Sequence, residues 1–155
     1  MTERPLWAPW RIDYITGPKG DQCIFCDPDP AHLVERGERC VTILNAYPYA
    51  PGHTMVAPIR HVGEFDELED PELVELMQRA RRVIAAQRRA MNPDGFNVGL
   101  NLGRVAGAGI ADHLHLHVVP RWEGDTNFMP VLGETPVIPQ ALEETRNVLV
   151  EALPG

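Results

Sequence analysis

Four short segments of the chain carry residues typical of β-strands. Residues 41–45 and 53–58 are rich in apolar and β-branched residues, and residues 96–101 and 113–119 alternate between apolar and polar positions. Because successive strand side chains point to opposite faces, each alternating segment has one face available for a core. The prolines and the glycine of residues 47–52 favour a turn, so the first two segments predict a hairpin.

Two further segments have the longer period of an amphipathic helix. In the first, Asp70 is the expected N-cap and Pro71 the first helical residue, and residues 92–95 end the helix. Its apolar positions have the spacing of one helical face: Leu73, Met77, Ala80 and Ile84. The second helix is expected at residues 139–153, where the shared face holds Leu142, Thr145, Val148, Leu149 and Ala152.

The order of strands, helix, strands and helix predicts an α+β fold with a mainly antiparallel sheet. We expect a single domain over residues 1–155, with an irregular N-terminal segment at 1–39, a core at 40–128 and the C-terminal helix at 139–153. The irregular segment contains Trp-Ala-Pro-Trp-Arg at residues 7–11. This short sequence is either a hydrophobic clamp onto the body or a partner subunit, or a contact for a ligand base.

Composition and charge narrow the class of protein. Apolar residues make up 44% of the 155 residues, which is typical of a globular chain, and no apolar run is long enough to span a bilayer. The N-terminus lacks the apolar core of a signal peptide, so a cytoplasmic location is expected. A net charge of −8 argues against broad binding of nucleic acid, although it leaves room for a small phosphorylated ligand.

Three histidines alternate with leucine in the sequence His113-Leu114-His115-Leu116-His117. In a strand the three imidazoles share one face, and the leucines pack behind them. Imidazole suits nucleophilic, acid–base or metal chemistry near neutral pH. The strand is therefore the first candidate for an active site.

The cysteines indicate metal or redox chemistry. Cys23 and Cys26 form a C-x-x-C pair, and Cys40 is the only other cysteine. An odd number of cysteines without a signal peptide makes a disulfide framework improbable. No βαβ unit surrounds the pair, so metal binding is the better interpretation than redox activity, and Cys40 is expected in the core.

Several motifs in order resemble the histidine-triad (HIT) superfamily of nucleotide hydrolases and nucleotidyl transferases. They are Asn45, Pro51-Gly52-His53, Pro58-x-x-His61 and the His-φ-His-φ-His-φ-φ strand, where φ is apolar. The resemblance runs from about Cys23 to Trp122. Segments near both ends, such as residues 7–11 and 120–128, resemble the bacterial diadenosine-tetraphosphate phosphorylase-like branch.

The resemblance implies roles for the site residues. His115 attacks the α-phosphate and carries the nucleotidyl group, and His117 donates to phosphate oxygens. The glycine-rich loop at 103–109 brings backbone N–H groups, including those of Gly107 and Ala108, close to phosphate. Asn45 contacts ribose, or simply begins a turn. His53 matches a histidine that lies near the ligand in the family, although a structural role is equally compatible, and Asn101 matches a polar position near the phosphate.

The resemblance also implies a structural zinc ion with four protein ligands: Cys23, Cys26, His61 and His113. Two thiolates and two imidazoles suit tetrahedral zinc, and no coordination position is left for chemistry. Such an ion fixes the strand that holds His115. The alternative is a pair of reduced cysteines packed as small apolar residues.

The expected function is cleavage of dinucleoside polyphosphates through a nucleotidyl-His115 intermediate. With inorganic phosphate as acceptor, diadenosine tetraphosphate gives ATP and ADP. With water as acceptor, the protein is a hydrolase of diadenosine polyphosphates or of adenosine phosphoramidates. A nucleotide-binding protein with vestigial catalysis is the alternative from another class, and a redox or purely zinc-binding module leaves the histidine strand unexplained. The resemblance further implies a homodimer, with a tetramer as an alternative. The sequence leaves base preference open.

Overall fold

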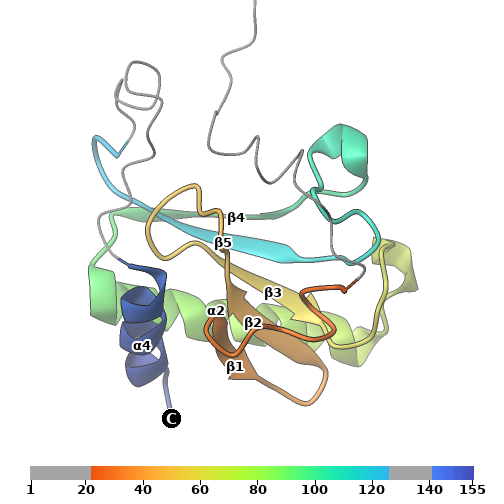
Figure 1. Cartoon of the computed structure of the whole chain (residues 1–155), viewed down its shortest axis with the longest axis horizontal. Coiled ribbons are helices and arrows are strands. Elements are labelled where there is room, and N and C mark those ends of the chain that lie inside the picture. The colour runs from red at the N-terminus through yellow and green to blue at the C-terminus, as the bar shows by residue number, and fades with distance from the viewer. Residues whose placement is uncertain (1–21, 126–140) are drawn as a thin grey trace, which may run out of the picture.

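The computed structural model describes residues 22–125 and 141–155. Within these residues, five strands form one antiparallel sheet in the order β1-β2-β3-β5-β4 (Figure 1). The elements in chain order are β1 (Leu33–Arg36), β2 (Cys40–Leu44), β3 (Thr54–Pro58), η2 (Phe65–Glu67), α2 (Asp70–Met91), β4 (Gly95–Leu100), η3 (Arg104–Ala106), β5 (Leu116–Arg121) and α4 (Leu142–Ala152). The predicted α+β class and antiparallel sheet are confirmed.

The strands lie close to their predicted positions, with two differences. β2 and β3 form the expected hairpin, in which Leu44 pairs with Thr54. The first difference is β1, which lies inside the segment predicted to be irregular. It has only four residues, and a register shift interrupts its pairing with β2, so its sequence carries little of the alternation typical of a strand. β5 begins at Leu116 and not at His113, because Leu114 N–H instead donates to the carbonyl of Val62 at 2.7 Å.

The long helix α2 starts and packs differently from the prediction. Its N-cap is Glu69, whose side chain forms a capping box with Glu72, so Asp70 is already helical. Its end at Asn92, in the left-handed conformation, agrees with the prediction. Met77 was expected on the buried face but is 58% exposed. The buried face of α2 is rotated by about one residue from the predicted face. It contains Leu76, Ala80, Val83 and Ala86.

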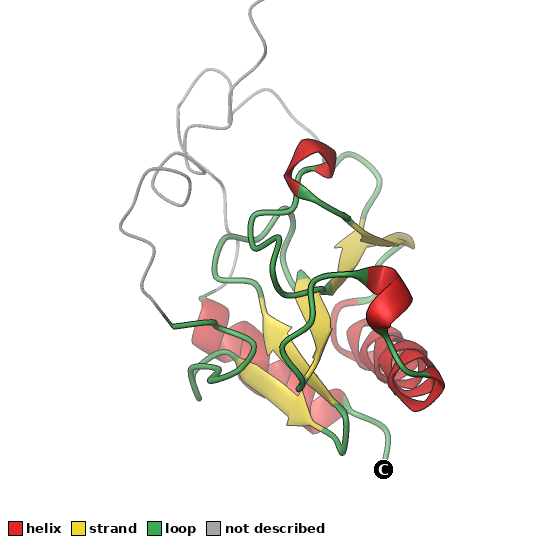
Figure 2. Ribbon diagram, turned by 90° about the vertical axis from the view of Figure 1, so that its right-hand side faces the viewer, coloured by secondary structure: helices red, strands yellow, loops and turns green. Residues whose placement is uncertain are grey.

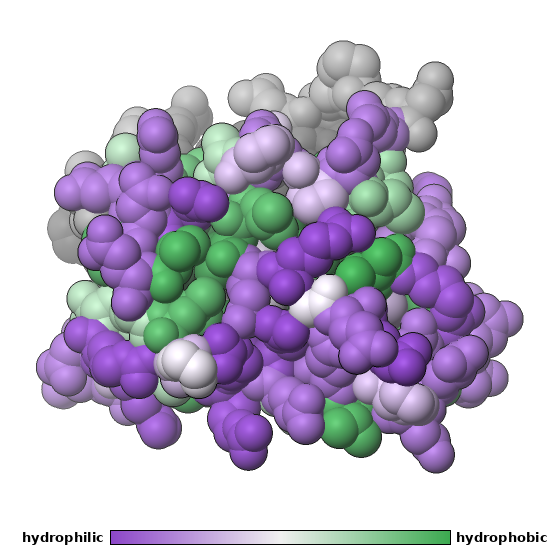
Figure 3. Space-filling view, turned by 90° about the horizontal axis from the view of Figure 1, so that it is seen from below, coloured by the Kyte–Doolittle hydropathy of each residue, from purple (hydrophilic) through white to green (hydrophobic). Residues whose placement is uncertain are grey.

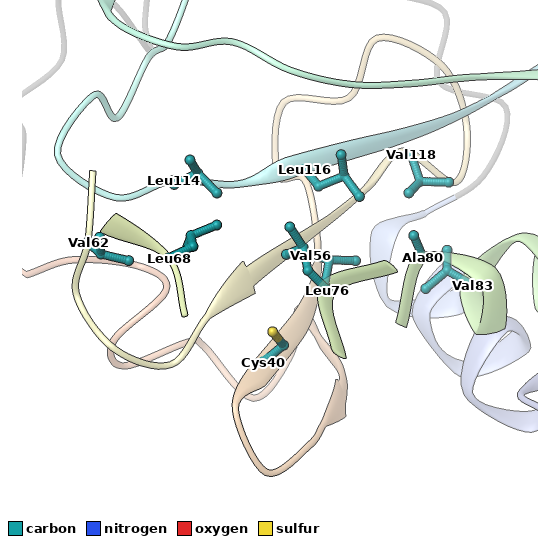
Figure 4. Close-up of a cluster of buried hydrophobic side chains, with 10 residues drawn as sticks. All are labelled: Cys40, Val56, Val62, Leu68, Leu76, Ala80, Val83, Leu114, Leu116 and Val118. Carbon is teal, nitrogen blue, oxygen red and sulfur yellow. The ribbon is translucent and has the colours of Figure 1, made fainter. Parts of the chain in front are cut away.

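The main hydrophobic cluster fills the space between α2 and the sheet (Figure 4). Leu114, Leu116 and Val118 point into this cluster, as the alternation predicted. Burial of each such side chain contributes about 1.5–3 kcal/mol. Because neighbouring strand residues point the opposite way, His115 and His117 lie on the face that α2 does not cover. The packing of these apolar side chains against α2 therefore determines the face on which His115 and His117 lie.

The shorter helix α4 packs against α2 and β1 in a separate cluster that includes Leu149. Thr145 and Leu149 are buried on its predicted inner face. Side chains of α2 hold the end of α4 and the residues after it: Arg89 donates to the carbonyl of Ala152, and Arg82 donates to that of Pro154. The predicted start of the helix at 139, the segment 7–11 and the end of the predicted core at 126–128 lie outside the described residues.

Viewed almost along α2, the strands lie on one side of this helix (Figure 2). The face seen from below is mostly hydrophilic, with apolar residues gathered in a few places (Figure 3). Within the described residues, no helix is long and apolar enough to cross a membrane.

Candidate active site and metal centre

A cavity of about 320 Å³ lies on the face of the sheet that α2 does not cover. Of the residues predicted to bind nucleotide or to act in catalysis, it brings together Asn45, Gly107, His115 and His117. Its other walls come mainly from the segment after Cys23, from β2 and β3, and from the glycine-rich loop. The additional lining residues are Ile24, Asp29, His32, Ile43, Leu44, Ala46, Tyr47, Tyr49, Met55, Gly109 and Ile110.

His115 has the geometry of a neutral nucleophile. Its Nδ1 lies 2.8 Å from the carbonyl oxygen of His113. A carbonyl only accepts, so Nδ1 carries the proton and Nε2 keeps its lone pair. Burial lowers the pKa of His115, and the bond to the carbonyl opposes this only in part. The ring also stacks on Phe25, with 4.9 Å between centroids and 25° between planes.

His117 is held by a second histidine. Its Nδ1 lies 2.9 Å from Nε2 of His53. His53 is fully buried and is not among the residues that line the cavity. The sequence pattern placed His53 near the ligand or in a structural, hydrogen-bonded role; its burial and its bonds fit the structural role, and its contact with a ligand stays a prediction. Tyr49 stacks on His53 at 4.7 Å between centroids and lies 6.0 Å from the His117 ring.

Asn45 forms the turn that the sequence offered as one of its two roles, and its side chain also lines the cavity. Its Oδ1 accepts the backbone N–H of Tyr47 at 2.9 Å, which is the bond of a turn-forming asparagine. Its Nδ2 lies 3.4 Å from Nδ1 of His53. The same side chain lines the cavity, so contact with a ribose remains a prediction that this geometry permits.

The glycine-rich loop is more ordered than expected. Gly103 and Gly107 have φ values of 79° and 95°, which favour glycine, and they flank the short helix η3. The backbone N–H of Gly107 donates to Arg104 and that of Ala108 to Gly103. These two amides are therefore engaged within the loop, and Ala108 is buried. Phosphate binding by Gly107 and Ala108 stays a prediction that requires the loop to rearrange.

Asn101 lies beside this loop and not on the cavity wall. A Cβ placed on Gly107 would be 3.8 Å from Nδ2 of Asn101. Asn101 is half-buried and is not among the lining residues. Its predicted place near the phosphate is thus untested, although it adjoins the segment that borders the cavity.

The four predicted metal ligands converge at one point. One ligand atom from each of Cys23, Cys26, His61 and His113 lies within 4.8 Å of all the others. Nδ1 of His113 is 3.2 Å from Sγ of Cys23, 3.6 Å from Sγ of Cys26 and 3.2 Å from Nδ1 of His61. Tetrahedral zinc with ordinary bond lengths separates such ligand atoms by about 3.3–3.8 Å, so the donor set and the three distances from His113 fit zinc.

The surroundings of the cluster also suit metal binding. Nε2 of His113 lies 2.8 Å from the carbonyl oxygen of Pro58, which leaves Nδ1 as the ligand atom. His113 is fully buried, and burial lowers its pKa, which favours the neutral, metal-binding form. Cys40 is distant from the cluster by its place in the core. Burial raises its pKa to about 12, so it remains a thiol.

Several functional positions were not singled out from the sequence. Phe25, between the two cysteines, contacts the rings of both His113 and His115. Tyr47 and Tyr49 were interpreted only as part of a turn, but both line the cavity. The only signal for these residues was their position next to recognised motifs. These residues reach the site through tertiary contacts, which a local sequence pattern does not encode.

A five-stranded antiparallel sheet that presents alternating histidines above a cavity, with a long helix behind, defines a histidine-triad protein. A profile of the HIT domain matches residues 28–124 of this chain. The chain therefore belongs to the HIT family.

Individual relatives agree with this assignment. A Mycobacterium tuberculosis protein named AP-4-A phosphorylase is 42% identical, over 93% of this chain and 81% of that protein. An uncharacterized HIT-like protein of Mycoplasma genitalium is 30% identical, over 84% of this chain and 93% of that protein. Among solved structures, a zinc-bound histidine triad family protein from Mycobacterium smegmatis has a TM-score of 0.69 and 29% identity, covering 84% of this chain and 92% of that one.

Proposed function

We propose that the protein transfers a nucleotidyl group from a dinucleoside polyphosphate to inorganic phosphate through His115. The observation that carries this proposal is the geometry of His115: its Nδ1 donates to the carbonyl of His113, and the ring borders the cavity together with His117. A neutral imidazole with a free Nε2 is a good nucleophile. The similarity to AP-4-A phosphorylase supports diadenosine tetraphosphate as the substrate.

The reaction runs in two displacements. In the first, Nε2 of His115 forms a bond to the α-phosphorus, and the bond from that phosphorus to the bridging oxygen breaks. The electron pair leaves with the oxygen, so ATP departs and an adenylyl group remains on the histidine. In the second, an oxygen of inorganic phosphate attacks the same phosphorus, ADP forms and the imidazole is restored. Nε2–H of His117 donates to phosphate oxygens as charge shifts.

The walls of the cavity supply the remaining contacts of this proposal. The apolar side chains of Ile24, Ile43 and Met55 form a surface for a base. Asn45, at the end of β2, faces the same cavity and can accept from or donate to ribose hydroxyls. Apolar contacts alone discriminate weakly between bases, so the polar lining residues decide base preference.

We assign a structural role to zinc held by Cys23, Cys26, His61 and His113. All four ligand positions are protein atoms, so the ion has no open position for substrate. It ties the segment after residue 22 to the chain just before β5. Phe25 in that segment then stays against the His115 ring. The expected homodimer remains a prediction from the family.

Hydrolysis is the alternative that the same site supports, because water can replace phosphate as acceptor. Product analysis of purified protein with diadenosine tetraphosphate separates the two reactions. ATP plus ADP, formed only with inorganic phosphate, is the expected result. ATP plus AMP without phosphate would make the protein a hydrolase with the same nucleophile. Absence of turnover, together with tight binding of nucleotide, would favour a binding protein.

A further inference from the structure

His53 is a fully buried side chain with hydrogen-bonding partners at both ring nitrogens. Nδ1 lies 3.1 Å from the backbone N of Tyr49, and Nε2 lies 2.9 Å from Nδ1 of His117. Because it is fully buried and is not among the cavity-lining residues, His53 has no direct access to substrate. Any influence on the reaction must pass through the residues that it contacts.

The backbone of Tyr49 sets the direction of this chain of hydrogen bonds. A backbone N–H only donates, so Nδ1 of His53 accepts. Asn45 agrees with this direction: its Oδ1 accepts from Tyr47, so its Nδ2, at 3.4 Å, is a second donor facing His53 Nδ1. In a neutral imidazole one nitrogen accepts and the other donates. The proton of His53 is therefore on Nε2, which donates to His117.

The same rule then fixes His117. Its Nδ1 accepts from His53, so the proton of neutral His117 lies on Nε2, the nitrogen remote from His53. The reversed chain, with Nδ1 of His117 as donor, needs a proton on Nδ1 of His53. That proton would face the N–H of Tyr49 and the amide nitrogen of Asn45, which are both donors.

We infer that His53 is a positioning residue, which holds His117 with its Nε2–H directed to the phosphate site. This inference rests on the proposed function, since it assigns the support of a catalytic donor. The phosphate group then accepts a hydrogen bond from the Nε2–H of neutral His117, whose orientation is fixed by His53. His53 itself does not touch the substrate.

Packing around the two rings keeps this arrangement rigid. Tyr49 stacks on His53 with 29° between the planes and lies at the same angle to His117. Behind the turn, Gln87 of α2 donates to the carbonyl of Gly52 at 2.8 Å, directly before His53. The helix that supports the core thus also supports the residue that orients His117.

The proton positions can be measured without substrate. In wild-type protein labelled with ¹⁵N, the nitrogen shifts and long-range couplings of a histidine ring report its tautomer. We expect both His53 and His117 to be neutral with the proton on Nε2. A proton on Nδ1 of either ring would overturn the inference. This measurement stands even if the protein acts on a different substrate, so it is separate from the test of the proposed function.

Two variants of His53 test the catalytic consequence. In His53→Gln the carboxamide can accept from Tyr49 and donate to His117, as the imidazole does. His53→Phe keeps the ring and its bulk but removes both hydrogen bonds. Loss of the hydrogen-bond partner of a metal-ligating histidine costs about 10- to 100-fold in activity, and by analogy we expect a loss of that size in kcat for His53→Phe, with KM nearly unchanged.

His53→Gln should recover most of that loss in kcat. Equal losses in the two variants, or a loss confined to KM, would contradict a positioning role. If His53→Phe does not fold, the wild-type ¹⁵N tautomers and the kcat of His53→Gln decide the question, since a loss of about tenfold or more in the kcat of His53→Gln would contradict the inference.

Discussion

The two ends of the histidine row use the same side chain for opposite purposes. At one end, His113 donates from Nε2 to the carbonyl of Pro58 and presents the lone pair of Nδ1 to the Cys23, Cys26 and His61 cluster. At the other end, Nδ1 of His117 lies 2.9 Å from Nε2 of His53, and the tautomers inferred above make His53 the donor and leave the proton of His117 on Nε2. The partner of one ring nitrogen decides what the other can do.

His115 lies between these ends and contacts a histidine of each. Its Nδ1 donates to the carbonyl of His113, a residue of the metal end, and its ring lies 4.9 Å from that of His117. Phe25, carried by the C-x-x-C segment, covers one side of the ring. The proposed nucleophile therefore contacts both ends, through a hydrogen bond to His113 and a ring contact with His117.

The largest effect is expected from removal of the nucleophile. His115→Asn should lower kcat by roughly 10³-fold or more, since covalent catalysis is lost, while nucleotide affinity stays within a few-fold. Steady-state kinetics and calorimetric binding of a nucleotide measure the two quantities. Substantial residual turnover would place the nucleophile elsewhere and remove His115 from the centre of the comparison.

Loss of a ligand at the metal end should have the next largest effect. Cys26→Ala should remove the bound zinc and lower the free energy of unfolding by several kcal/mol, because metal binding is coupled to folding. Cys40→Ala is the matched control: it deletes a cysteine of the core and should keep one zinc ion per chain. Metal analysis together with thermal unfolding measures both. Unchanged zinc in Cys26→Ala and His113→Ala would refute the four-ligand site.

Phe25 allows the connection between the metal end and the nucleophile to be tested. In Phe25→Leu the side chain stays apolar but the ring contact with His115 is lost. We expect kcat to fall by about tenfold, since small misplacement of a nucleophile is costly, while zinc content is retained. Loss of zinc in Phe25→Leu would instead make Phe25 a part of the metal site.

The smallest effect concerns the ion pair between Arg60 and Glu72. Arg60, its neighbour in sequence, donates from Nε and Nη2 to the nearly buried carboxylate of Glu72, at 3.0 and 2.8 Å. The hydrogen bonds from Arg60 lower the pKa of Glu72. The ionised form therefore stabilises the folded state above the unfolded pKa of about 4.3, and this stabilisation is lost as the pH falls through the folded value.

Glu72→Gln should accordingly cost about 1–2 kcal/mol in the free energy of unfolding at pH 7 and progressively less below pH 4. Denaturant unfolding at several pH values measures the difference between variant and parent. A cost that stayed constant down to about pH 3 would show that the carboxylate charge is not responsible.

Local patterns predicted four of the five described strands and both long helices, whereas the convergence of Cys23, Cys26, His61 and His113 was expected from the family resemblance. The alternation from His113 to His117 predicted which side chains face the core, and Asn92 was correctly expected to end α2. Met77 was placed on the wrong face because several apolar residues of α2 fit two overlapping stripes, and only packing against the sheet selects the one with Leu76. Capping by Glu69 was missed since glutamate is not a typical N-cap.

The support of the site was harder to predict than its chemistry. A motif placed His53 near the ligand, but its burial and its bond to His117 depend on the register in which Met55 of β3 pairs with His117 of β5. Phe25 acquires its role only when the C-x-x-C segment folds against the chain before β5. The roles of His53 and Phe25 therefore depend on contacts between residues distant in sequence, which local periodicity does not predict.

The central claim is that His115 carries the nucleotidyl group, and mass spectrometry of phosphate-free enzyme tests it most directly. Enzyme mixed with diadenosine tetraphosphate and quenched rapidly should release about one ATP per active site. It should also carry one adenylyl group on the peptide that contains His115, and inorganic phosphate should discharge this group as ADP. Turnover without any adduct, or an adduct on a different residue, would contradict the account.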